Sequence, residues 1–108
     1  MKCRYILAPE AARDLVQIWR YLKKESNQET ADRVESVIRD KIVYLAKFPD
    51  SAGHWRPDLT SAQVRFSSVY SYLIVHRPEM KPLQVVAILH AHRDVAKLLT
   101  KRLRPSSG

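Results

Sequence analysis

The residues best suited to chemistry in this chain stand together at the end of one apolar run. The segment LQVVAILHAHRD, residues 83–94, closes with His90, His92, Arg93 and Asp94. Imidazoles transfer protons and bind metals near neutral pH, and a guanidinium binds carboxylates or phosphates through paired hydrogen bonds. Because polar groups at the end of a rigid strand are well placed to meet another molecule, this segment is the first candidate for a functional site.

His90 and His92 are two residues apart, so they share one face if the strand continues that far. That spacing permits shared metal ligation or acid–base chemistry. Zinc requires three or four ligands, however, and the single cysteine, Cys3, lies at the other end of the sequence. The histidines could instead bond to a backbone group or to Asp94, or form a polar patch that contacts a target. We therefore expect no metal and no cofactor.

Arg93 and Asp94 can serve the following helix as well as a partner. The aspartate can cap the helix and orient the arginine by a paired hydrogen bond, so structural and target-contacting roles both stay open for Arg93. Other aromatic or basic side chains near the predicted strands and on the last helix are further target-contact candidates. These are Arg65, Tyr70, Tyr72, His76, Arg77, Lys97 and Lys101. The tyrosines and His76 fit either a packed sheet face or an exposed contact surface.

Chain length and net charge limit the classes of function that this protein can have. A chain of 108 residues suits one domain, predicted over 1–104 and followed by a frayed tail at 105–108. We expect a cytoplasmic protein, because there is no signal-peptide pattern, no membrane-length apolar run and one cysteine only. The formal net charge is +8; residues 1–54 carry ten Lys/Arg against eight Asp/Glu, and residues 55–108 carry nine against three. This asymmetry favours nucleic acid or an acidic protein as the partner.

Hydrophobic spacing predicts the elements that position these residues. A strand at 2–8 precedes a helix that starts at Pro9 and ends near Lys24, and a possible capping box from Ser26 to Glu29 starts a second helix that stops at Phe48–Pro49. Strands follow at 63–68, 72–76 and from 83 onward, with a turn at 69–71, and a helix spans 93–103. The buried character of the third of these strands places it in the middle of a sheet. The fold class is α+β: an N-terminal strand, an antiparallel helical hairpin, a three-stranded antiparallel meander and a C-terminal helix.

With this order of elements, several segments resemble the RelE/ParE superfamily of toxins from bacterial type II toxin–antitoxin pairs. They are LAPEAARDLVQIWRYL, FPDSAG after the second helix, VRFSSVYSYLIVHRP, and VVAILHAHRD with its closing His90, Arg93 and Asp94. The likeness runs from Tyr5 to Leu103. It implies a RelE/ParE-like fold, a cognate antitoxin as partner, and one of two activities. RelE-like members cut mRNA at the ribosome, whereas ParE-like members bind and poison DNA gyrase.

The chain departs from the RelE-like nuclease pattern. RNA cleavage requires proton transfer at two oxygens and cationic stabilisation of the phosphate. Where RelE-like chains carry an arginine on the middle strand, this chain has Ser71-Tyr72-Leu73, and the last helix has leucines where a catalytic tyrosine is expected. The resemblance is therefore closer to ParE, with no catalytic residues. The alternatives are an mRNA endonuclease using Arg65, His90, His92 and Arg93, and an inactive antitoxin-binding module. Candidates for antitoxin binding are Leu15, Trp19, Leu22 and Trp55.

Overall fold

The computed structural model describes residues 4–49 and 52–103. The elements along the chain are β1 (Tyr5–Leu7), α1 (Pro9–Glu25), α2 (Gln28–Lys47), β2 (Arg65–Val69), β3 (Tyr72–Arg77), β4 (Leu83–His90) and α3 (Val95–Arg102). This order, with β2 to β4 as an antiparallel meander, confirms the predicted α+β class. Cys3 and the predicted tail at 105–108 lie outside the described residues.

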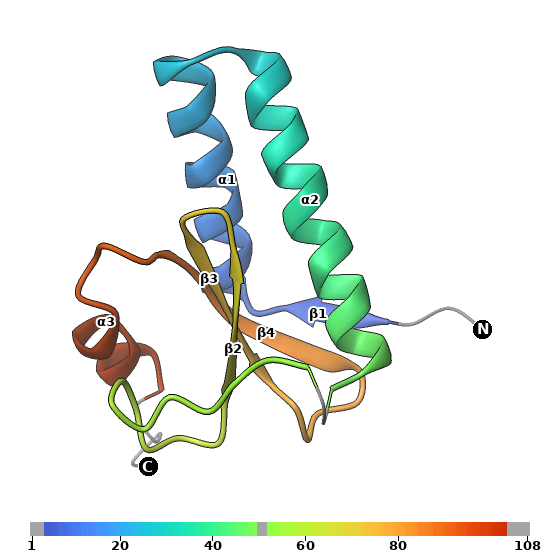
Figure 1. Cartoon of the computed structure of the whole chain (residues 1–108), viewed down its shortest axis with the longest axis vertical. Coiled ribbons are helices and arrows are strands. Elements are labelled where there is room, and N and C mark those ends of the chain that lie inside the picture. The colour runs from blue at the N-terminus through green and yellow to red at the C-terminus, as the bar shows by residue number, and fades with distance from the viewer. Residues whose placement is uncertain (1–3, 50–51, 104–108) are drawn as a thin grey trace.

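The two long helices form the antiparallel hairpin that stands over the sheet in Figure 1. Pro9 occupies the first turn of α1, where its missing N–H costs nothing. The predicted capping box at Ser26 is wrong. The backbone N–H of Ser26 closes α1 by donating to the Leu22 carbonyl at 2.8 Å. The cap of α2 is Asn27, whose extended backbone lets its side-chain oxygen accept from the Thr30 N–H at 2.7 Å.

The sheet has the strand order β1-β4-β3-β2, with β1 parallel to β4 and the other pairs antiparallel. The apolar run of β4 therefore lies between two strands, and almost all of its residues are buried, as the sequence predicts. Val75 pairs with Ala87 and His76 with Val85, so Val86 has no opposite residue on β3. This bulge places Val86 and Ala87 on the same face of the sheet.

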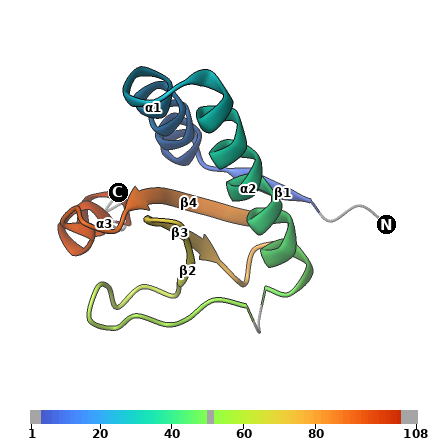
Figure 2. The same ribbon diagram turned by 45° about the horizontal axis from the view of Figure 1, so that its top comes forward.

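Each face of the sheet carries its own core. The hairpin of α1 and α2 covers one face, as Figure 2 shows, and the core there joins the two helices to Ile74, Val85 and Ile88. On the other face, α3 and the segment before β2 pack against Val75 and Leu89. The sheet is thus a buried middle layer, and the end of β4 at His90 emerges beside the hairpin and before α3.

Gly53 brings the segment after α2 close to the sheet. Its φ of +83° is one that side-chain-bearing residues rarely adopt, and an added Cβ would lie 3.0 Å from the Phe66 carbonyl oxygen. His54 then exchanges two backbone hydrogen bonds of 2.8 Å with Phe66 and covers part of the outer edge of β2. His76 is enclosed below this segment with no exposed surface.

Candidate functional site

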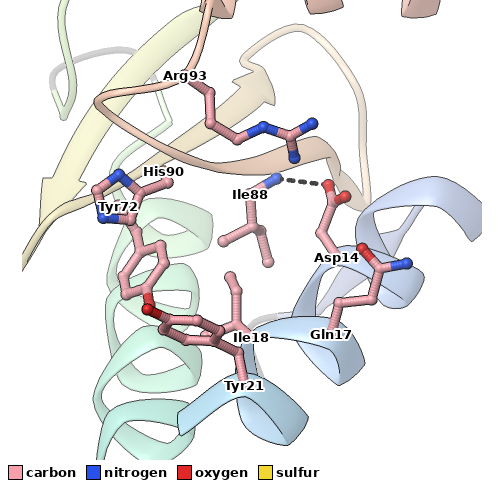
Figure 3. Close-up of a pocket in the computed structure, with 8 residues that line it drawn as sticks. All are labelled: Asp14, Gln17, Ile18, Tyr21, Tyr72, Ile88, His90 and Arg93. Atoms are coloured by element: carbon pink, nitrogen blue, oxygen red, sulfur yellow. Dashed lines mark hydrogen bonds between the residues drawn. The ribbon is translucent and has the colours of Figure 1, made fainter. Parts of the chain in front are cut away.

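A pocket of about 320 Å³ opens between α1 and the end of β4. We call it the tyrosine pocket. Figure 3 shows the residues that line it: Asp14, Gln17, Ile18, Tyr21, Tyr72, Ile88, His90 and Arg93. Helix α1 supplies four of them at spacings of three, one and three, which is one face of a helix. The other four come from β3, β4 and the turn after β4.

Strand register brings the aromatic groups of this pocket together. Tyr72 is directly opposite His90 in the β3–β4 ladder, and their ring centroids are 5.4 Å apart in an edge-to-face arrangement. The His92 ring follows at 5.0 Å from His90, and the His92 backbone N–H donates to His90 Nδ1 at 3.1 Å. The predicted bond between a histidine and a backbone group is thus confirmed.

The turn after β4 places Arg93 at the mouth of the pocket, where Figure 3 shows its side chain extended across the opening. Arg93 is exposed, and its side chain forms no hydrogen bond or ion pair with any residue that the structure describes. The predicted pairing with Asp94 is absent, because the Asp94 carboxylate accepts the Lys97 N–H at 3.1 Å and caps α3. The helix-capping half of the prediction is confirmed.

Asp14 forms the closed wall of the pocket. Strand β1 ends at Leu7, beside Val85, so among the described residues the part of β4 beyond Val85 has no strand neighbour on that side. The Asp14 carboxylate takes the place of that neighbour by accepting the Ile88 N–H at 3.0 Å. It also binds Arg102 through two hydrogen bonds, the longer at 2.7 Å. Arg102 thus ties α3 to α1 around the edge of β4.

The electrostatics of the site follow from these contacts. Burial raises the pKa of the Tyr72 phenol, and the neighbouring Tyr21 adds to the rise. The Asp14 carboxylate raises the pKa of Arg102, with a smaller contribution from Glu10, whose carboxylate lies 3.1 Å from Arg102 Nε. The pocket therefore has a buried Tyr72 phenol, a carboxylate in its wall that Arg102 neutralises, and at its rim the Arg93 guanidinium, which pairs with no described residue.

The structure does not gather all target-contact candidates at this site. Tyr72, His90 and Arg93 line the pocket and His92 adjoins them. Arg65 lies elsewhere: it pairs with His76, four residues along β3 from Tyr72, or about 13 Å at the usual rise per residue. Its guanidinium lies over the Trp55 ring, 4.9 Å from the centroid. Other basic candidates are dispersed, with Arg77 half-buried beside Gln84 and Arg102, and Lys97 and Lys101 exposed on α3.

Tyr70 belongs to a second depression. It stands at the tip of the β2–β3 hairpin, 63% exposed, in a left-handed conformation with φ of 54°. With Val37, Lys41 and Tyr44 of α2 it borders an open groove of about 660 Å³, whose other lining residues are Asp40, Ser68 and Val69. We call this the α2 groove.

Two of the predicted contact residues are wrong, because neither has more than 1% of its surface exposed. His76, a target-contact candidate, has no exposed surface, and Leu15, an antitoxin candidate, is 1% exposed within the core. Trp19 packs in the helical hairpin, where its indole N–H donates to Asp32 of α2 at 2.7 Å. Leu22 is half-buried in the same helix, whereas Trp55 is 48% exposed on the loop before β2. These antitoxin candidates do not form one surface.

Three residues that lie at the pocket or support its wall are not among the candidates predicted from the sequence: Asp14, Tyr21 and Arg102. Arg102 is a basic residue in the last turn of α3, yet its side chain is only 15% exposed and pairs with Asp14. The one sequence signal for Asp14 is its position, one residue before the buried Leu15 on a helix otherwise lined by apolar groups. Tyr21 could be found from its spacing to Asp14, since seven residues make two helical turns.

Two classes of site are not seen. Within residues 4–49 and 52–103, no three His, Cys, Asp or Glu side chains converge as a metal site would require. In the same part of the chain, neither long helix holds an apolar stretch of the length that crosses a bilayer.

Comparison with known families supplies the assignment. Residues 5–95 match the family described as "ParE toxin of type II toxin-antitoxin system, parDE". The chain belongs to the ParE toxin family. A search of curated proteins gives no match. Among solved structures, a chain from the "Chromosomal ParDE TA system from P. aeruginosa" is similar with a TM-score of 0.71 and 18% identity, covering 84% of this chain and 98% of that one. At this identity the likeness supports the fold, and it agrees with the ParE-like fold predicted from the sequence.

Proposed function

We propose that this ParE-family toxin acts in the cytoplasm by binding DNA gyrase and trapping it with cleaved DNA, and that a cognate antitoxin neutralises it. One observation favours binding over RNA cleavage: the residues that an endonuclease would use do not lie together, because Arg65 is far from His90, His92 and Arg93. Arg65 is about 13 Å along the sheet from the His90–Arg93 turn. The Arg65 guanidinium lies over the Trp55 ring, 4.9 Å from its centroid, and Arg65 is not among the residues that line the pocket beside Arg93.

A supercoiling assay with purified gyrase tests this function. Excess toxin is expected to leave relaxed plasmid unconverted and to accumulate linear DNA after protein digestion. Arg93→Glu is expected to weaken this effect, and Lys47→Glu, a charge reversal at the far end of α2, serves as its matched control. Full supercoiling without trapped cleavage complex at toxin excess would refute the proposal.

The antitoxin is proposed from charge as well as from family. Residues 55–108 carry nine basic against three acidic side chains, which favours an acidic segment that becomes ordered as it binds. Growth arrest on expression of the toxin alone, relieved by the product of the neighbouring reading frame, is the expected result. Unimpaired growth would instead support an inactive antitoxin-binding module.

An mRNA endonuclease remains the second candidate, because Tyr72, His90 and Arg93 do face one pocket. A phenol, an imidazole and a guanidinium are groups that phosphodiester cleavage uses. Primer extension on ribosome-bound message separates the two classes. Specific cuts that disappear in His90→Ala or His92→Ala would establish the enzyme and displace the gyrase proposal.

A further inference from the structure

The tyrosine pocket has the size and lining of an anchor site for one side chain. Its floor is apolar, made by Ile18 and Ile88, and the phenols of Tyr21 and Tyr72 stand on one side of it (Figure 3). A volume of about 320 Å³ is at the small end of the range for ligand pockets. Tyr21 is 60% exposed although its ring lines the pocket, so it offers a large amphipathic surface to a partner.

The positive charge at the rim of the tyrosine pocket favours a partner that carries a carboxylate. The guanidinium of Arg93 is exposed and pairs with no described residue, and His90 and His92 lie beside it. The carboxylate of Asp14 does not cancel this charge, because it is bound by Arg102 and the Ile88 N–H. A partner side chain with a carboxylate therefore finds an available bidentate donor at the mouth.

These features favour a peptide over nucleic acid. A phosphate backbone is held by several cations spaced along it, and this pocket presents one arginine above an apolar floor. The α2 groove is a weaker site for an acidic partner, because its lining contains one acidic residue, Asp40, and one basic residue, Lys41, and so has no excess positive charge.

We propose that the tyrosine pocket anchors an acidic segment of the antitoxin. One aromatic or large aliphatic side chain packs on Ile18 and Ile88 beside the two phenols, while a neighbouring carboxylate pairs with Arg93. This inference rests on the proposed function, because it takes the antitoxin as the occupant. The bound segment covers the His90–Arg93 turn, which also holds the target-contact candidates, so neutralisation follows from direct competition.

The test measures binding of the full-length toxin to the purified product of the neighbouring reading frame by calorimetry. Tyr21→Ala and Arg93→Glu alter exposed side chains and are expected to weaken binding about tenfold or more each. Raising the salt concentration should reduce the deficit of Arg93→Glu and leave that of Tyr21→Ala, since only the first is electrostatic. Tyr44→Ala in the α2 groove and Lys47→Glu are the matched controls and should bind within about twofold of wild type.

Any other outcome would overturn the proposal that the tyrosine pocket anchors the antitoxin. Pocket variants that bind like wild type, or controls that lose as much, would place the antitoxin elsewhere. Tyr21→Ala could instead leave antitoxin binding unchanged and abolish self-association of the toxin in sedimentation, which would show that the pocket binds a second copy of the toxin. If the same variant instead loses affinity for a single-stranded RNA oligonucleotide, the pocket binds RNA. Failure of the wild-type toxin to bind the neighbouring product would refute the proposed function itself, a result distinct from the loss of the pocket alone.

Discussion

Removing the Asp14 carboxylate should be among the most damaging single changes in this toxin. In Asp14→Ala, the Ile88 N–H at the edge of β4 loses its acceptor, which costs about 1–3 kcal/mol for a buried donor. Arg102, 15% exposed, also loses its paired hydrogen bonds, and breaking a buried pair from one side costs about 3–5 kcal/mol. Glu10 at 3.1 Å stays as a partner for Arg102, so the two losses do not sum fully.

We expect a net destabilisation of about 3 kcal/mol, a large part of the stability of an ordinary domain. It corresponds to a fall in melting temperature of roughly 12 °C for a chain of this length. Asp14→Asn keeps an acceptor for the Ile88 N–H and should fall about halfway between wild type and Asp14→Ala. Arg102→Met should cost about 2 kcal/mol, and the double variant at least about 0.5 kcal/mol less than the sum, because the two residues share one interaction.

Urea unfolding followed by circular dichroism measures these differences, with equal slopes showing that the unfolded states are alike. The matched control is Asp58→Ala, which removes an equally well-formed pair with Arg56, at 2.8 and 3.0 Å, on a solvent-exposed loop. That variant should melt close to wild type, because exposed ion pairs contribute little. The reasoning is refuted if Asp14→Ala unfolds at the same urea concentration as Asp58→Ala.

Three other changes test separate features by the same urea midpoint. Burial lowers the pKa of His76 from its ordinary 6.5, so the unfolded chain binds more protons below that pH; stability should fall as pH drops through about 6.5, and the slope should flatten in His76→Leu. Asn27→Ala should cost about 1 kcal/mol by removing the α2 cap, and Ser26→Ala much less; equal costs would contradict the assigned cap. Tyr70→Gly should raise stability or leave it unchanged, since a left-handed conformation costs a side-chain-bearing residue about 1–2 kcal/mol; a clear loss would show that the Tyr70 ring is packed.

Element order was predictable because each element carries its own local signal. The apolar stripe of α2, the proline at the start of α1 and the unbroken valines and isoleucines of β4 all reflect constraints within a few residues. The predicted N-cap of α2 was wrong by one residue. Ser26 and Asn27 are both good capping residues, and which of them caps α2 depends on which one already closes α1.

The candidate site was predicted in part. The sequence correctly predicts that His90 to Arg93 lie at the end of β4 and that Asp94 caps α3. The opposite wall of the pocket was not foreseen, because Asp14 and Tyr21 lie about 70 residues earlier in the chain than His90 and Arg93, and their positions on α1 do not show that this helix docks beside the end of β4. The burial of His76 and Leu15 was missed for a similar reason: a polar residue on a strand or an apolar one on a helix does not show which face the fold will cover.

Hydrophobic periodicity and turn residues determine the helices and strands that the described residues form, their order and the central place of β4, because those signals act between near neighbours. Only the tertiary structure decided that Asp14 would pair with Arg102, that Tyr72 would face His90 and that Arg65 would lie away from the His90–Arg93 turn. Those outcomes depend on strand register and on how a helix docks against a sheet edge. Many side chains contribute to that docking energy, and no short stretch of sequence contains it.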